Sequence, residues 1–65
     1  MLTIRDFRPR ERIRIHPACD WFMRGATHAR VVSVGRTRLK VQLEIGGADV
    51  GRPVSLSPDD VLDFA

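Results

Sequence analysis

Apolar and polar residues alternate along much of this chain with the period of two that is typical of β-strands. From Arg38 to Ile45 the odd-numbered positions are apolar and the even-numbered positions are charged or polar. This pattern predicts a half-buried antiparallel strand. The segment 12–16 alternates in the same way and ends before Pro17, which cannot donate a hydrogen bond to a strand ladder. Each alternation predicts one face toward a core and one toward solvent.

Further short strands are predicted at 30–34, 54–56 and 61–64. The phase of the first of these is open. In a regular strand Val31 and Ser33 share a face, whereas a β-bulge turns Val31 and Val34 inward together. We favour the bulge, because a small barrel needs one in order to bend.

Turn signals separate these strands. Gly35-Arg36-Thr37 predicts a tight hairpin, 17–28 a long loop, and Ser57-Pro58 a capped 3-10 turn before the last strand. Closure is the usual way to remove exposed strand edges. We therefore predict an all-β fold, a small five-stranded antiparallel barrel over 11–65. It follows an N-terminal lead, 1–10, that is either flexible or an added edge strand.

Composition agrees with one small globular domain. The chain has 65 residues, of which 43% are hydrophobic and 29% charged, and its single cysteine excludes an internal disulfide framework. No apolar run approaches the roughly 18–20 residues that span a bilayer. A core of this size leaves little volume for a catalytic cleft. We expect a cytoplasmic, non-enzymatic protein without cofactor, membrane contact or small-molecule substrate.

Charge is distributed unevenly and suggests an anionic partner. Residues 1–40 carry a net charge of +7 and residues 41–65 carry −4. If Ile13 and Ile15 face the core, Arg12 and Arg14 must face solvent. The same alternation places further cations of the neighbouring strands on the outer face, and one more lies at the hairpin tip. Together they form a predicted basic stripe that would bind RNA or DNA: Arg12, Arg14, Arg30, Arg36, Arg38 and Lys40. The alternative is that the two halves of the chain neutralise each other once folded.

The long loop holds the second candidate site. Trp21-Phe22-Met23 is followed by Arg24, and an exposed tryptophan beside an arginine can grip a peptide or stack on a base. In an extended loop neighbouring side chains point in opposite directions. We therefore assign Phe22 to a plug at the open end of the barrel, Met23 to its edge, and Trp21 to the exposed side. The alternative for Trp21 is partly buried packing.

Metal and nucleophile chemistry has weak support in this sequence. His16, Cys19, Asp20 and His28 are the candidate ligands, but zinc needs four ligands, commonly in paired short spacings. Cys19 lacks an orienting third group for nucleophilic catalysis. We predict no metal site and no catalytic residue; His16 is interpreted as a strand-end residue and Cys19 as a small loop residue.

The order of the segments 11–16, 29–35 and 39–43 resembles SH3-like barrels. The segments 16–18 and 20–25 look like those of small bacterial and phage domains of that fold. A looser likeness extends to the SH3-like accessory subunit of photosystem I and to KOW-type barrels, although Ala29 replaces the glycine that often opens their second strand. The resemblance implies a binding or accessory module. Its partner is expected to be RNA or DNA on the basic stripe, or a larger protein docking through Trp21 and Arg24. A domain with no ligand of its own is a third possibility.

Overall fold

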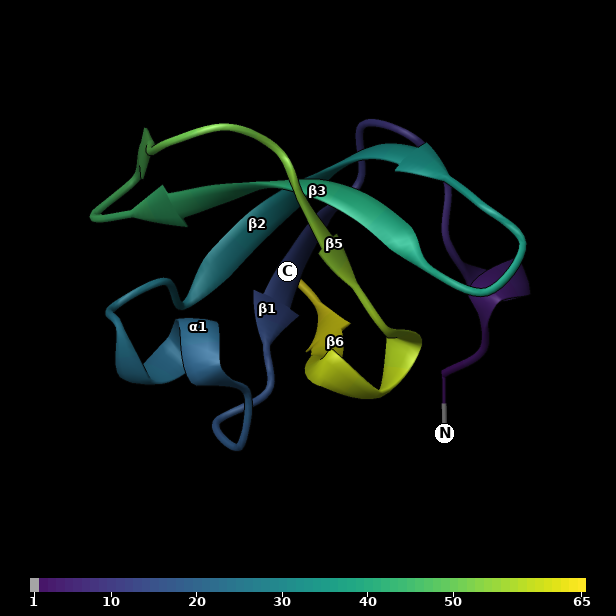
Figure 1. The fold of residues 1–65 in the computed structure, drawn as a ribbon, viewed down its shortest axis with the longest axis horizontal. Coiled ribbons are helices and arrows are strands. Elements are labelled where there is room, and N and C mark those ends of the chain that lie inside the picture. The colour runs from purple at the N-terminus through teal and green to yellow at the C-terminus, as the bar shows by residue number, and fades with distance from the viewer. Residues whose placement is uncertain (1) are drawn as a thin grey trace.

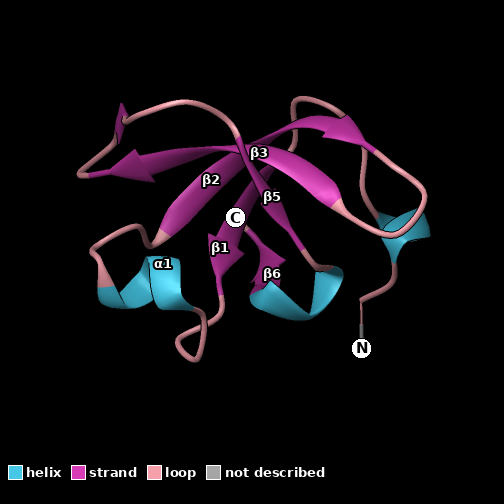
Figure 2. Cartoon of the chain, in the orientation of Figure 1, coloured by secondary structure: helices cyan, strands magenta, loops and turns pink. Residues whose placement is uncertain are grey.

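The computed structural model describes residues 2–65 and consists mainly of antiparallel β-strands (Figures 1 and 2). The strands are β1 (Arg12–Ile15), β2 (His28–Val34), β3 (Leu39–Ile45), β4 (Ala48–Asp49), β5 (Val54–Leu56) and β6 (Val61–Phe64). The helical turns are η1 (Ile4–Asp6), α1 (Asp20–Met23) and η2 (Pro58–Asp60). None of these helices is long and apolar enough to cross a membrane. The all-β prediction and the 3-10 turn before the last strand are confirmed.

The strands form one curled sheet. The strand order is β4-β3-β2-β1-β6. The strands β5 and β4 pair with the same edge of β3, β5 near its start and β4 near its end. Every pairing is antiparallel. Within residues 2–65 no ladder joins β5 to β6, so the sheet is open. A closed five-stranded barrel is therefore not confirmed, and the two-residue β4 raises the strand number to six.

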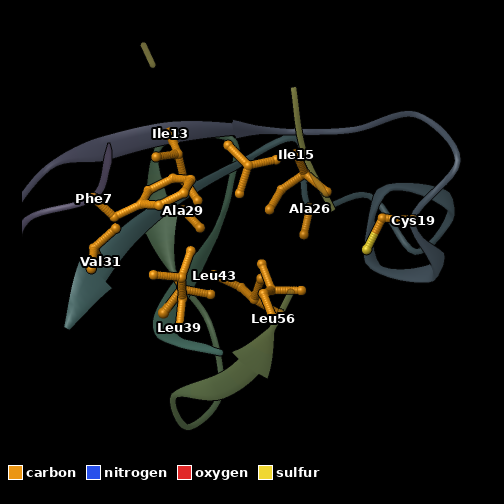
Figure 3. Close-up of a cluster of buried hydrophobic side chains, with 12 residues drawn as sticks. Phe7, Ile13, Ile15, Cys19, Ala26, Ala29, Val31, Leu39, Leu43 and Leu56 are labelled. Atoms are coloured by element: carbon orange, nitrogen blue, oxygen red, sulfur yellow. The ribbon is translucent and has the colours of Figure 1, made fainter. Parts of the chain in front are cut away.

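The inward face follows the alternation in the sequence. Ile13, Ile15, Leu39 and Val41 are each no more than 1% exposed and meet in one cluster (Figure 3). Phe7 joins them at 1% exposure, although it precedes the predicted start of the barrel and lies in no strand. The core thus depends on a residue that the periodicity does not indicate.

The predicted bulge is present in β2. The register against β3 shifts between Val31 and Ser33, so Val31 is buried and Val34 packs against the core. The extra residue, Val32, is 45% exposed. The hairpin that follows needs its glycine, because a Cβ at Gly35 would lie 2.9 Å from the carbonyl oxygen of Arg38. The bulge and this turn together determine which side chains of β2 and β3 lie opposite each other near the hairpin, where Ser33 faces Lys40.

The segment 17–28 is not a continuous loop, since residues Asp20–Met23 form the short helix α1. Helical spacing brings Trp21 and Phe22 against the core together, each half-buried. Met23 is 80% exposed. The assignment of Met23 to the packed edge is therefore wrong. For Trp21 the alternative of partly buried packing is confirmed instead of the exposed position, because neighbouring side chains on a helix do not point in opposite directions.

Candidate functional site

The outer face of the sheet carries the arginines of the predicted basic stripe, but strand register places carboxylates in the same rows. Arg14 lies opposite Asp63 of β6 and His28 of β2. Farther along this row, His28 lies opposite Glu44, and Glu44 lies opposite Asp49. Directly opposite side chains on one face of a sheet are close enough to interact. The row therefore contains an acid at each of three strands and no continuous run of cations.

Two of the arginines pair with carboxylates across one strand. Both Nε and Nη2 of Arg12 lie 3.1 Å from Oε1 of Glu44. Nη2 of Arg30 lies 2.9 Å from Oδ2 of Asp49. The Glu44 residue is 8% exposed, so Arg12 supplies the charge that this nearly buried carboxylate needs.

Arg14 donates from Nε and Nη2 to the two carboxylate oxygens of Asp63, which is a bidentate pair. The hydrogen bond from Arg14, with its positive charge, lowers the pKa of Asp63. The same hydrogen bond, with the charge of the carboxylate, raises the pKa of Arg14. Both groups remain charged near neutral pH, and their charges offset each other.

The basic stripe is therefore not a row of six free cations. Arg30 lies opposite Arg12, as expected, but Lys40 lies opposite Ser33, beyond the bulge. Arg36, Arg38 and Lys40 make no ion pair within residues 2–65. The stripe divides into three neutralised arginines over β1 and β2 and three uncompensated cations at the β2–β3 hairpin. For the first three, the alternative that the two halves of the chain neutralise each other is correct.

An apolar hollow of about 260 Å³ opens between α1 and the far end of β3. In Figure 1 these elements lie at the end of the molecule opposite the β2–β3 hairpin. The residues that line the hollow are Trp21, Arg24, Ala26, Leu43, Ile45, Val50, Gly51, Arg52 and Val54. Most of these side chains are apolar, and Ile45 is 42% exposed. We call this feature the apolar hollow below.

One wall of the apolar hollow is fixed by a side chain behind it. The amide nitrogen of Gln42 donates to the carbonyl oxygens of Val50 (2.8 Å) and Gly51 (3.2 Å). The backbone N–H of Val50 also donates to the carbonyl oxygen of Leu43 (3.0 Å). These bonds hold the segment after β4 against β3, so the hollow is built into the fold.

Two arginines stand at the apolar hollow. The guanidinium of Arg24 lies over the ring of Trp21, with its Cζ 5.1 Å from the ring centroid. Neither Arg24 nor Arg52 makes an ion pair in the described part of the chain. The structure thus brings the predicted partner-binding residues Trp21 and Arg24 together. Sequence reasoning missed Arg52, and it missed Ile45, the last apolar residue of the clearest alternation.

Among the candidate metal ligands, the two histidines make local hydrogen-bond contacts. Nδ1 of His16 accepts the backbone N–H of Ala18 (3.0 Å), and Cys19 is buried. Nδ1 of His28 lies 3.0 Å from the hydroxyl of Thr27. Across residues 2–65 no three His, Cys, Asp or Glu side chains form a group that could hold a metal ion.

Comparisons with protein-family models, with curated proteins and with solved structures find no match to this chain.

Proposed function

We propose that this chain is a small non-enzymatic binding module of the SH3-like kind, which docks a segment of a partner protein in the apolar hollow. The antiparallel all-β sheet and the 3-10 turn before β6 support the SH3-like assignment, because the expected fold is a small antiparallel barrel with such a turn before its last strand. The partner is a peptide segment with one large apolar side chain next to aspartate or glutamate.

The observation that carries this proposal is an uncovered apolar hollow with two uncompensated arginines. Its volume, about 260 Å³, lies below the range of about 300–1,000 Å³ that is usual for small-molecule sites. A space of this size suits one or two apolar side chains. Arg24 and Arg52 then favour a neighbouring carboxylate, since a guanidinium binds carboxylates in a bidentate manner.

We expect the interaction to be weak. Burying one leucine-sized side chain stabilises a complex by about 1.5–3 kcal/mol, and each exposed charge pair adds about 0.2–1 kcal/mol. Loss of translational and rotational freedom offsets much of this gain. A Kd of about 1 mM or weaker is expected for a short peptide, because 1 mM already corresponds to about 4.1 kcal/mol of net binding free energy, and a larger partner surface would strengthen it.

The single tryptophan of the chain makes a direct test possible, because Trp21 lines the hollow. The probe is a short acetylated peptide with a central leucine flanked by glutamates. We expect a saturable change in Trp21 fluorescence, with matching amide shifts at Leu43 and Val50 in NMR spectra. The same peptide with lysines in place of glutamates should bind much more weakly, because Arg24 and Arg52 repel it.

Two exposed aliphatic residues provide a matched pair of variants. Ile45→Ser removes part of the hollow, whereas Val32→Ser removes a similarly exposed side chain (42% and 45% exposed, respectively) away from it. Binding should be lost in Ile45→Ser and retained in Val32→Ser. No saturable response in the wild-type chain, or an equal loss in both variants, would contradict the proposal.

Binding of RNA or DNA along all six residues of the basic stripe has less support. Arg12, Arg14 and Arg30 each have a carboxylate partner, so a phosphate must compete with that partner for each of them. At the apolar hollow, no carboxylate of the described residues pairs with Arg24 or Arg52, so a partner's carboxylate would have no internal competitor there.

A further inference from the structure

The β2–β3 hairpin end of the sheet presents an ammonium group between two hydroxyls. Lys40 lies directly opposite Ser33 of β2 on one side and Ser55 of β5 on the other. All three residues are exposed. Because directly opposite residues have Cβ atoms about 4.5–5.5 Å apart, the three side chains rise from one row of the outer face. Such a row offers one cation and two hydrogen-bond donors to an oxyanion.

Arg38 is fixed next to this row. Its Nε donates to Oγ of Ser55 (2.6 Å), and its Nη2 lies 3.4 Å from the carbonyl oxygen of Ser55. Because Oγ of Ser55 acts as the acceptor here, its own hydroxyl proton stays free to donate elsewhere. Nη1 of Arg38 makes no hydrogen bond within residues 2–65. The guanidinium is therefore held in place while part of its donor set remains open.

Further cations lie on the other side of β2. The segment around η1 lies beside the β2–β3 hairpin (Figure 1). Arg5 and Arg8 line a shallow hollow there with Ser33 and Gly35. Nη1 of Arg8 donates to the carbonyl oxygens of Arg5 (3.0 Å) and Phe7 (3.1 Å) and to no carboxylate of the described chain. These contacts leave the positive charge of Arg8 uncompensated.

The carboxylates of this region are already engaged by the backbone. Asp6 accepts the backbone N–H of Thr3 (2.7 Å), and Glu11 accepts that of Arg8. Neither makes an ion pair within residues 2–65. These two carboxylates are outnumbered by the five cations of this end, so an excess of positive charge remains in the folded chain: Arg5, Arg8, Arg36, Arg38 and Lys40.

We propose that this hairpin-end cluster (Arg5, Arg8, Arg36, Arg38 and Lys40) binds the phosphodiester backbone of a single-stranded nucleic acid. Its cations lie on both sides of the end of β2, which suits a chain of phosphates better than one isolated phosphate. No aromatic side chain lines the shallow hollow except the buried Phe7, so we expect no stacking on bases and no sequence preference. This site is separate from the apolar hollow and does not depend on it.

The test uses a fluorescein-labelled oligo-dT and fluorescence anisotropy over a range of salt concentrations. For a single strand, log K falls with log salt at a slope of about −0.7 for each phosphate contact. Arg36→Gln/Lys40→Gln removes two cations of the cluster and keeps the Arg38–Ser55 contact. Arg24→Gln/Arg52→Gln is the control, because it removes two unpaired cations at the other end and lowers the net charge equally.

We expect the cluster variant to bind about 25-fold more weakly near 0.1 M salt and the control to bind nearly as well as wild type. Ser55→Ala should weaken binding by about two- to ten-fold through the lost hydroxyl. Equal weakening in both double variants would mean that binding follows net charge alone and would overturn the proposal. So would binding to phosphatidylserine vesicles without binding to oligo-dT.

Failure of this proposal can be distinguished from failure of the proposed function. Arg36→Gln/Lys40→Gln leaves every residue of the apolar hollow in place, so it should not alter the response of Trp21 to the acidic peptide.

Discussion

The ion pair between Arg12 and Glu44 should contribute more to the stability of the fold than the other ion pairs on the outer face of the sheet. We expect Arg12→Gln to destabilise the fold much more than Arg30→Gln. Both arginine side chains are about half exposed (50% and 48%), and each pairs with one carboxylate. Their partners differ, because the Glu44 side chain is 10% exposed and that of Asp49 is 53% exposed. The loss of stability on removing each arginine should therefore increase with the burial of its carboxylate partner.

The magnitude follows from that difference. Loss of a hydrogen bond to a charged group that stays buried costs about 1.5–3 kcal/mol, and breaking a fully buried ion pair costs about 3–5 kcal/mol. Arg12 is half exposed, and water can reach the site once its side chain is shortened. We therefore expect about 1.5–2.5 kcal/mol for Arg12→Gln. An exposed pair such as Arg30–Asp49 contributes about 0.2–1 kcal/mol.

The measurement is urea unfolding followed by Trp21 fluorescence, with a double-mutant cycle on Arg12 and Glu44. A chain of this length is expected to be stable by roughly 3–10 kcal/mol, so the difference is measurable. Glu44→Gln in the Arg12→Gln background should recover most of the loss, because it removes the uncompensated buried charge. Equal effects of Arg12→Gln and Arg30→Gln, or no recovery in the double variant, would refute the reasoning.

Two further predictions concern stability at other places in the fold. Pairing with Arg14 holds the pKa of Asp63 below the ordinary value of 3.8, so Asp63 stabilises the fold fully above that value and loses this contribution as the pH falls through the folded pKa. Urea midpoints should therefore fall less steeply in acid for Asp63→Asn than for wild type. Identical acid dependence of the two chains would contradict the assignment. Phe7→Ala should lower the free energy of unfolding by about 3–5 kcal/mol, because Phe7 is 1% exposed. Phe64→Ala should lower it clearly less, because Phe64 is 38% exposed. A Phe7→Ala chain as stable as wild type would show that the segment before β1 contributes nothing to the core.

Alternation in the sequence predicted the faces of the strands but not the partners across them. Ile13 and Val41 point inward and Arg12 points outward, because parity along an extended chain determines the face. The same parity also turns Glu44 outward, yet it says nothing about register, and register is what places Glu44 within reach of Arg12. The opposite net charges of the two halves of the sequence suggested neutralisation in general, but not which carboxylate meets which arginine.

Other features gave no periodic signal. Phe7 stands alone between a turn and a strand, and its burial depends on how the lead folds back over the core. The helix α1 has four residues, Asp20–Met23, which is too short for a pattern of period 3.6 to be recognised. The long-range contacts that bring Arg24 and Arg52 to one hollow are properties of the folded chain, so the pattern of a local segment could not indicate them.

The neutral middle of the outer face separates the two proposed binding sites. The helix α1, which borders the apolar hollow, and the β2–β3 hairpin lie toward opposite ends of the longest axis (Figure 1), along which the molecule measures 27 Å. Charge interactions at the surface are screened over about 8 Å at physiological ionic strength. The carboxylates of Glu44, Asp49 and Asp63 further offset the arginines between the two ends. A phosphate chain bound as proposed at the hairpin would therefore have no continuous cationic path to the apolar hollow, and a peptide bound as proposed in the hollow would leave the hairpin free.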